Sequence, residues 1–281
     1  PAIATVAVVP FGSTLFGVPM VIADVNVGVL YVFAIASLGV YGIVIAGWSS
    51  NSKYPFLGSV RSSSQMISYE LSLGLSVIPI FLLVGRLRLT EIVQYQIDHG
   101  WVIAPFIGDW GNPAKWLLTI PMVISFCVFT VAIFAETNRL PFDLPEAETE
   151  LVGGYHTEYG SMKFALFFLG EYAAMITGSA IIVTLFLGGW HLPVPWWGNE
   201  GFHWIYVTGD APGWRGIAGG LFNIATFFGK VAALLLVFIW VRWTLPRFRY
   251  DQLMRLGWIF FFEIALVNIF VAALIIAYLP Q

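Results

Sequence analysis

The chain alternates between long apolar runs and short segments that carry most of its polar and charged residues. Runs of about 17 or more mostly apolar residues are long enough to cross the hydrocarbon core of a bilayer. A shorter run over Pro1–Val9 stops at a Pro-Phe-Gly sequence and is interpreted as the tail of one further span. The predicted full spans are Val21–Trp48, Ser62–Val84, Lys115–Ala135, Ser161–Leu187, Ile217–Val241 and Gly257–Leu279. The pattern therefore predicts an all-α polytopic membrane protein, with one transmembrane helical domain over residues 1–281 and six full helices plus one partial helix.

Three connecting segments carry structural signals of their own. Arg86–Ile97 is amphipathic, and we expect it to lie as a helix at the membrane surface. The Pro/Trp/Gly-rich segment Gly188–Gly216 predicts an interfacial hairpin or extended loop, not a span. Asp143-x-x-Glu146 is a capping-box pattern with Pro145 in its first turn, so we expect a short helix over Asp143–Val152.

Composition supports the membrane assignment and excludes several functions. The chain is 59% hydrophobic and 10% charged, whereas soluble domains carry about 25% charged residues. No basic tract for nucleic acid is present. Cys127 is the only cysteine, so the chain forms no internal disulfide, and no Cys/His cluster has the spacing of a metal or iron–sulfur site. We expect this chain to bind neither a metal nor a nucleotide, because a Gly-rich nucleotide loop is also missing.

Positive charge divides the loops into two groups. The richer group carries Lys53, Arg61, Arg139, Lys163, Arg242, Arg247, Arg249 and Arg255. The poorer group carries Arg86, Arg88, Lys115 and Arg215. Because Lys and Arg beside a span resist translocation, we expect the richer side to face the cytoplasm or matrix. The loop 136–160 falls on that side, and the loop 188–216 falls on the opposite side.

Acidic residues crowd the loop 136–160. They are Glu136, Asp143, Glu146, Glu148, Glu150 and Glu158, with Arg139 between them. Phe142, Leu144, Leu151 and Tyr155 are interleaved with these acids, so we expect the segment to be packed and not freely solvated. A solvated acidic loop remains the simpler interpretation for Glu148 alone.

Four ionisable residues lie inside predicted spans. Glu70 and Glu171 are about 12 and 15 Å deep at 1.5 Å per residue, and Lys230 is near the middle of its span. Charges at such depth are costly in lipid and usually face a bundle interior or water. With the acidic loop, these residues indicate a proton path from the aqueous side to the membrane interior. Snorkelling or a structural ion pair is the alternative, and it suits Glu263, near a predicted span end, equally well.

A stripe of polar residues recurs at helical spacing in the second predicted span. It comprises Ser62, Gln65, Tyr69, Ser72 and Ser76. Such a stripe is typical of a packing face between membrane helices. We therefore expect it to contact another helix.

Several motifs resemble those of a known family. The segment Glu136-Thr-Asn-Arg-x-Pro-Phe-Asp-Leu-Pro-Glu-Ala-Glu148 resembles the signature of the large hydrophobic subunit at the heel of respiratory complex I, which is the H subunit in bacteria and subunit 1 in mitochondria. The resemblance covers nearly the whole chain. Further matches are Gly47–Tyr54, Gln65–Glu70, Glu158-Tyr159, Phe164–Tyr172, Leu187–Trp190 and Leu245–Met254.

The resemblance implies a role in proton-pumping NADH:quinone oxidoreductase. The family has eight transmembrane helices, and its first helix and first quinone loop have no counterpart in this sequence. The resemblance implies that quinone is the substrate, that partner subunits hold NADH, flavin and iron–sulfur clusters, and that this chain alone has no activity. It assigns the quinone chamber and proton path to Glu136, Arg139, Asp143, Glu146, Glu148, Glu158, Glu171 and Glu70. The depth of Lys230 in its predicted span adds that residue to the set. The resemblance assigns contact with the hydrophilic arm to Lys53, Arg61, Arg242, Arg247, Arg249 and Asp251.

Two alternatives remain open at the level of sequence. Membrane subunits of energy-converting hydrogenases and related dehydrogenases share ancestry with this family. A stand-alone transporter would predict inverted repeats with broken helices at matching positions, and no such symmetry is seen. The resemblance implies the bacterial inner membrane as the location, with the mitochondrial inner membrane as the alternative, and other membrane subunits and the hydrophilic arm as partners.

Overall fold

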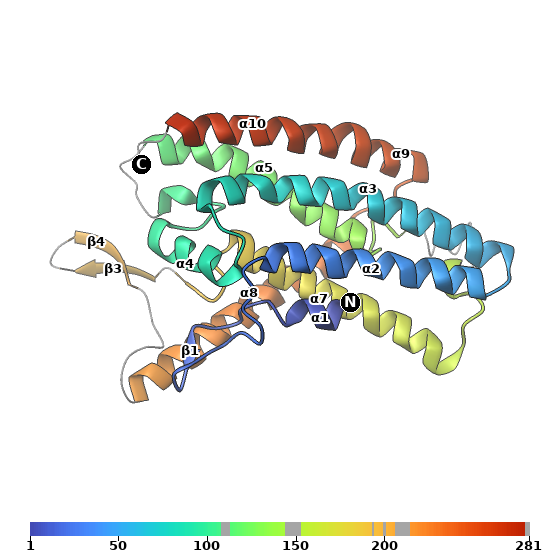
Figure 1. Ribbon diagram of the computed structural model, residues 1–281, viewed down its shortest axis with the longest axis horizontal. Helices are drawn as coiled ribbons and strands as arrows, with labels where there is room; N and C mark the ends of the chain where they lie inside the picture. The colour runs from blue at the N-terminus through green and yellow to red at the C-terminus, as the bar shows by residue number, and fades with distance from the viewer. Residues whose placement is uncertain (108–112, 144–152, 193, 199–200, 206–213, 279–281) are drawn as a thin grey trace.

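The computed structural model describes residues 1–107, 113–143, 153–192, 194–198, 201–205 and 214–278. The described part is a helical bundle (Figure 1). Its helices are α1 (Ala2–Val6), α2 (Gly28–Ser49), α3 (Lys53–Val84), α4 (Leu89–His99), α5 (Pro113–Glu136), α7 (Ser161–Phe186), α8 (Trp214–Thr244), α9 (Tyr250–Arg255) and α10 (Phe262–Tyr278). Short 3-10 helices span Pro105–Ile107 and Gly154–His156, and a π-helical segment, Leu256–Phe261, joins α9 to α10. The strand pairs are β1 (Thr14–Leu15) with β2 (Val18–Pro19), and β3 (Val194–Gly198) with β4 (Gly201–Ile205).

Six helices of the described part are long and apolar enough to cross a membrane, which confirms the predicted number of full spans. Their bounds differ from the prediction at three places. The second span begins at Lys53, nine residues earlier than predicted, because the polar residues before Ser62 continue the helix. The first span begins only at Gly28, because Asp24 and Asn26 lie in the non-helical segment before it. The last is continuous over Tyr250–Tyr278, so Glu263 lies near its middle and not near its end.

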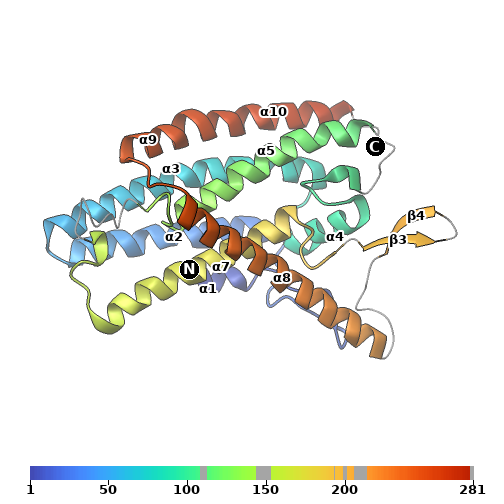
Figure 2. The same cartoon turned by 180° about the vertical axis from the view of Figure 1, so that it is seen from behind.

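The long helices α2, α3, α5, α7 and α10 run along the long axis of the molecule, and α8 crosses them obliquely (Figure 2). Successive helices run in opposite directions, so one end of the bundle collects the last turn of α5, the first turns of α3 and α7, and the connection from α8 to α9. This end carries the acidic loop and is called the acidic end below.

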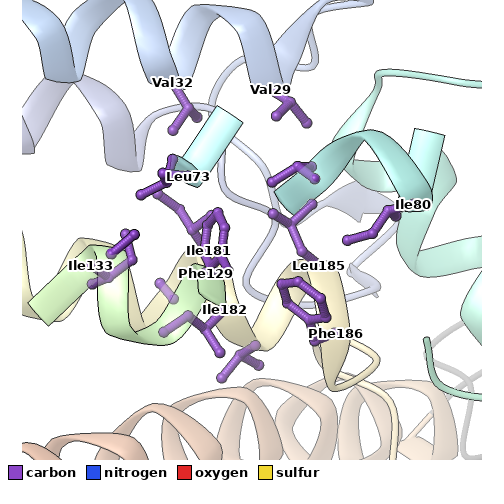
Figure 3. Close-up of a cluster of buried hydrophobic side chains, with 14 of the residues drawn as sticks. Val29, Val32, Leu73, Ile80, Phe129, Ile133, Ile181, Ile182, Leu185 and Phe186 are labelled. Carbon is purple, nitrogen blue, oxygen red and sulfur yellow. The ribbon is translucent and has the colours of Figure 1, made fainter. Parts of the chain in front are cut away.

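Apolar side chains from four helices form the centre of the bundle (Figure 3). Val32 of α2, Leu73 of α3, Phe129 of α5 and Phe186 of α7 are all almost fully buried. The rings of Phe129 and Phe186 lie 5.5 Å apart between centroids. Aromatic packing of this kind fixes α5 against α7, the two helices that carry Glu136 and Glu171.

The polar stripe of α3 forms a packing face, as predicted. All five of its residues are buried. The Tyr69 hydroxyl donates to the Leu253 carbonyl at 3.0 Å, and the Ser72 hydroxyl donates to the Gly257 carbonyl at 3.4 Å. The stripe thus binds α3 to the α9–α10 segment, where these hydrogen bonds satisfy groups that lipid could not.

The remaining loop predictions have mixed outcomes. The strand pair β3–β4 confirms a hairpin within Gly188–Gly216. The amphipathic segment forms α4, which begins at Leu89 and not at Arg86, and which buries Ile92, Val93 and Gln96 against the bundle. Its position relative to a membrane surface stays a prediction. The helix predicted over Asp143–Val152 lies, from residue 144 on, outside the described residues.

Candidate functional site

A cavity of about 500 Å³ lies between α1, α2, α3, α5 and α7. Most of its wall is apolar, and glycines of α2 and α7, such as Gly39 and Gly170, leave room where a side chain would stand. Carboxylates enter the wall from two helices: Glu136 ends α5, and Glu171 lies on α7. This volume falls in the range of small-molecule sites, which combine an apolar wall with a few convergent polar groups.

Glu171 is held by three side chains of the loop 136–160. Arg139 Nη2 lies 3.4 Å from Glu171 Oε2, and both side chains are only about one-tenth exposed. The Tyr155 hydroxyl donates to Glu171 Oε1 at 3.0 Å, and His156 Nε2 lies 4.0 Å from the same oxygen. The Arg139 guanidinium also stacks over the ring of Tyr172, 4.4 Å from its centroid. The Glu171 carboxylate is therefore fixed in position at the cavity wall.

His156 is a buried neighbour of this carboxylate. Its ring packs against Tyr155, with centroids 4.1 Å apart, and against Phe168. Burial lowers the pKa of His156, and the charge of Glu171 opposes that shift. Since burial is the larger cause, the ring is neutral at pH 7.

Asp143 extends the group of charged side chains around Glu171 toward the acidic end of the bundle. Arg247 Nη2 donates to Asp143 Oδ2 at 3.0 Å. Burial nonetheless raises the pKa of Asp143 to about 6, because desolvation outweighs the attraction of Arg247, and the nearby charge of Glu171 adds to the rise. Asp143 thus changes its charge close to physiological pH.

Glu70 and Glu136 form a second group of carboxylates on facing helices. The Ser37 hydroxyl of α2 donates to the Glu70 carboxylate of α3. Glu70 lies close enough to Glu136 for their charges to interact. Glu136 also lines the cavity that Glu171 lines. The cavity therefore connects the two groups of acids.

A buried glutamine of α3 fixes the loop after α5. Gln65 Nε2 donates to the Ala135 carbonyl at 2.8 Å and to the Phe142 carbonyl at 2.9 Å, so one amide bridges the last turn of α5 and the start of the acidic loop. Gln65 is fully buried. The bridge positions Arg139, which lies between the two bonded residues in sequence, and Asp143, which directly follows Phe142. The polar-stripe pattern predicted that Gln65 packs, but not that it holds this loop.

Comparisons with known proteins identify the family of the chain. A family model described as NADH dehydrogenase matches residues 1–273. The chain belongs to the NADH dehydrogenase family. The predicted resemblance is therefore confirmed, and it extends over nearly the whole chain.

Individual relatives of the NADH dehydrogenase family are 45–49% identical to the chain over the aligned residues. It is 49% identical over 279 residues to the H subunit of NADH-quinone oxidoreductase from Ehrlichia chaffeensis, covering 97% of this chain and 67% of that protein. It is 45% identical over 292 residues to the corresponding H subunit, numbered 1, from Geobacter sulfurreducens, covering 99% and 72%. It is 49% identical over 267 residues to the H subunit from Rhodospirillum rubrum, covering 95% and 67%. The chain spans about two thirds of the length of these relatives.

The structure brings together only part of the residues that this family resemblance assigns to the proton path. Glu136 and Glu171 line the cavity, Glu70 lies near Glu136, and Arg139 and Asp143 lie in the loop that follows α5. Glu158 is exposed at the acidic end. Glu146, Glu148 and Glu150 lie outside the described residues. Tyr155 and His156 join the group, although the sequence marked Tyr155 only as a packed residue and His156 not at all.

Lys230 lies apart from the acids. Its ammonium group donates to the carbonyls of Leu187 at 2.6 Å, Gly189 at 3.1 Å and His191 at 2.5 Å. It also lies over the Trp101 ring. These carbonyls follow the carboxyl end of α7, about 24 Å along that helix from Glu171 at 1.5 Å per residue. Lys230 therefore caps the end of α7.

The residues predicted to contact the hydrophilic arm gather at the acidic end. Lys53, Arg242, Arg247, Arg249 and Asp251 are exposed there, and Arg61 is half-buried with its guanidinium 5.7 Å from the Tyr250 ring centroid. The Phe248 amide donates to the Pro141 carbonyl at 3.2 Å, which ties the segment before α9 to the acidic loop. Within the described ranges, no group of three or more His, Cys, Asp or Glu side chains is placed to hold a metal ion.

Proposed function

We propose that the chain is a membrane subunit of a proton-translocating NADH:quinone oxidoreductase and that its acid-lined cavity couples quinone reduction to proton movement. The observation that carries this proposal is the position of Glu171. It lines the cavity on one side and pairs with Arg139 of the acidic loop on the other. The printed names of the relatives, which specify NADH and quinone, support the reaction.

The proton path runs through the carboxylates around the cavity. Asp143 receives protons near the exposed end, since its pKa of about 6 allows both charge states near neutral pH. Arg139 and Asp143 lie on one short loop, so a change of charge on Asp143 is felt by the Arg139–Glu171 pair. Glu136 and Glu70 then extend the path across the cavity toward α2. Glu158, which is exposed at the acidic end, supplies the entrance from water.

The exposed cations at the acidic end form the contact with the hydrophilic arm. Lys53, Arg242 and Arg249 project from three different segments of this end and favour an acidic partner surface. The partner carries the flavin and the iron–sulfur cluster that delivers electrons to the quinone. The bacterial relatives support a bacterial plasma membrane as the location, and the family assignment favours complex I over the hydrogenase and transporter alternatives.

Deletion of the chain tests this function. We expect membranes without it to lose quinone reduction by NADH, while NADH oxidation by a soluble artificial electron acceptor persists, because the hydrophilic arm carries out that reaction alone. Restoring a tagged chain should restore quinone reduction and copurify with the arm. Unchanged quinone reduction in the deletion strain, or a tagged chain that copurifies with no NADH-oxidising protein, would contradict the proposal.

A further inference from the structure

Glu263 is an ionisable side chain that the acid-lined cavity does not use. It is exposed on α10, near the middle of the span Tyr250–Tyr278. Hydrogen bonds on either side fix its depth in the bundle. Trp258 Nε1 donates to Ser68 Oγ at 2.9 Å, and Asn268 Nδ2 donates to the Pro121 carbonyl at 2.9 Å. Both acceptors belong to other candidate spans, so Glu263 lies at a depth that those spans also cross.

The Glu263 side chain points away from the bundle. α10 packs on α3 and α5 with the face that carries Ala265, Asn268 and Ala272, which are buried. At 3.6 residues per turn, Glu263 is about 160° around the helix from Ala265. It lies in a stripe of large exposed apolar residues, Phe260, Val267, Phe270 and Leu274. In both views of the molecule, α10 forms one edge of the bundle (Figures 1 and 2).

Lipid is an unfavourable neighbour for this carboxylate. Hydrocarbon offers neither an opposite charge nor a hydrogen-bond donor, so a side chain of this kind normally faces protein or water. Glu263 lies eight residues, about 12 Å at 1.5 Å per residue, beyond Arg255, the nearest charged residue before it in the chain. A glutamate side chain is too short to bring its carboxylate to a membrane surface from that depth.

We propose that the exposed face of α10 around Glu263 docks against a transmembrane helix of a neighbouring subunit, which presents a lysine or arginine to Glu263. An opposite charge offsets the desolvation of the carboxylate, and it fixes the register of the two helices. The apolar side chains on either side of Glu263 supply the packing surface. The inference rests on the proposed function, because that function places the chain in a membrane complex of several subunits.

Photocrosslinking identifies what covers this face. A photoreactive amino acid replaces Val267, one turn from Glu263, in the complex purified with its NADH:quinone reductase activity. We expect an adduct with a transmembrane segment of one other subunit that contains a lysine or arginine. Adducts with lipid alone, or with a second copy of this chain, in an active complex would overturn the inference and leave the proposed function intact. A chain that copurifies with no NADH-oxidising partner would contradict the proposed function, and this inference with it.

A charge series then tests the pairing. Glu263→Asp keeps the charge and should retain the crosslinked subunit in the purified complex. Glu263→Gln should lower its recovery, and Glu263→Arg should lower it about tenfold or more, because two buried cations then face each other. Changing the partner's basic residue to glutamate should restore recovery in the Glu263→Arg background. Wild-type recovery of the subunit with Glu263→Arg would overturn the pairing.

Discussion

Arg139 and Glu171 form an ion pair of 3.4 Å between the acidic loop and the cavity wall, 32 residues apart in sequence. Both side chains are almost fully buried, so their attraction is only weakly screened by water. Removing one partner of a buried pair leaves an uncompensated charge, at a cost of about 3–5 kcal/mol. The pair therefore couples the position of the loop to the charge of the cavity.

Arg139→Ala should lower quinone reduction by NADH by about tenfold or more, since Glu171 loses its cation and Tyr172 loses the stacked guanidinium. Arg139→Lys keeps the charge but not the planar stack, and we expect intermediate turnover. The measurement is quinone reduction per assembled complex. Normal turnover with Arg139→Ala would exclude a role for the pair in the reaction.

Asp143 should make the stability of the protein depend on pH in mildly acidic solution. Its pKa is raised in the folded state from 3.8 to about 6, so the folded state binds more protons than the unfolded state between these values. Protonated Asp143 therefore stabilises the folded state fully below pH 3.8, and this stabilisation is lost as the pH rises through about 6. At 1.36 kcal/mol per pH unit, it amounts to about 3 kcal/mol. The melting temperature in detergent should fall over this window for the wild-type chain and fall less for Asp143→Asn. An identical dependence of melting temperature on pH for the two proteins would contradict the raised pKa of Asp143.

Gln65→Leu should destabilise the protein and impair turnover together. The substitution removes both hydrogen bonds of the amide and leaves the Ala135 and Phe142 carbonyls buried without that donor, at about 1–3 kcal/mol each. Ser63→Ala is the matched control, because the Ser63 hydroxyl bonds only within its own helix at an exposed position. Equal melting temperatures and turnover for Gln65→Leu and the control would show that the bridge does not position the loop.

Lys230→Met should separate a structural role from a proton-transfer role. The substitution removes three hydrogen bonds from carbonyls at the end of α7, so thermal stability should fall by several degrees. We expect the number of protons moved per quinone reduced to stay unchanged in the complex that assembles. A lower number of protons moved per quinone reduced would show that Lys230 takes part in proton transfer.

The sequence predicted the six long apolar helices because the length of an apolar run is a property of local sequence. It predicted the polar stripe of α3 for the same reason, since spacing fixes which residues share a helix face. It placed Lys230 with the acids because depth in a span gives position along the membrane normal, but not position around the bundle. It placed Glu263 near a span end because the polar residues of Tyr250–Arg255 were not counted as part of the span, although they continue the helix.

The contacts of the site were harder to predict than its members. Glu171, Arg139 and Glu136 were found from charge and depth. The Gln65 bridge joins groups 70 and 77 residues apart, and only the folded chain brings them together. Tyr155 and His156 contact Glu171 because the loop before α7 packs closely on α3. At this contact Gly58 of α3 lies against the backbone of Gly154, so a side chain at position 58 would not fit.

The central claim is that Glu171 carries protons between the cavity and the acidic loop. Proton uptake per quinone reduced, measured in vesicles that contain the purified complex, tests it most directly with Glu171→Gln. The matched control is Glu91→Gln of α4, which lies outside the proposed path. The account predicts a large loss of proton movement for Glu171→Gln and no loss for the control. Proton movement at the wild-type ratio with Glu171→Gln would contradict it.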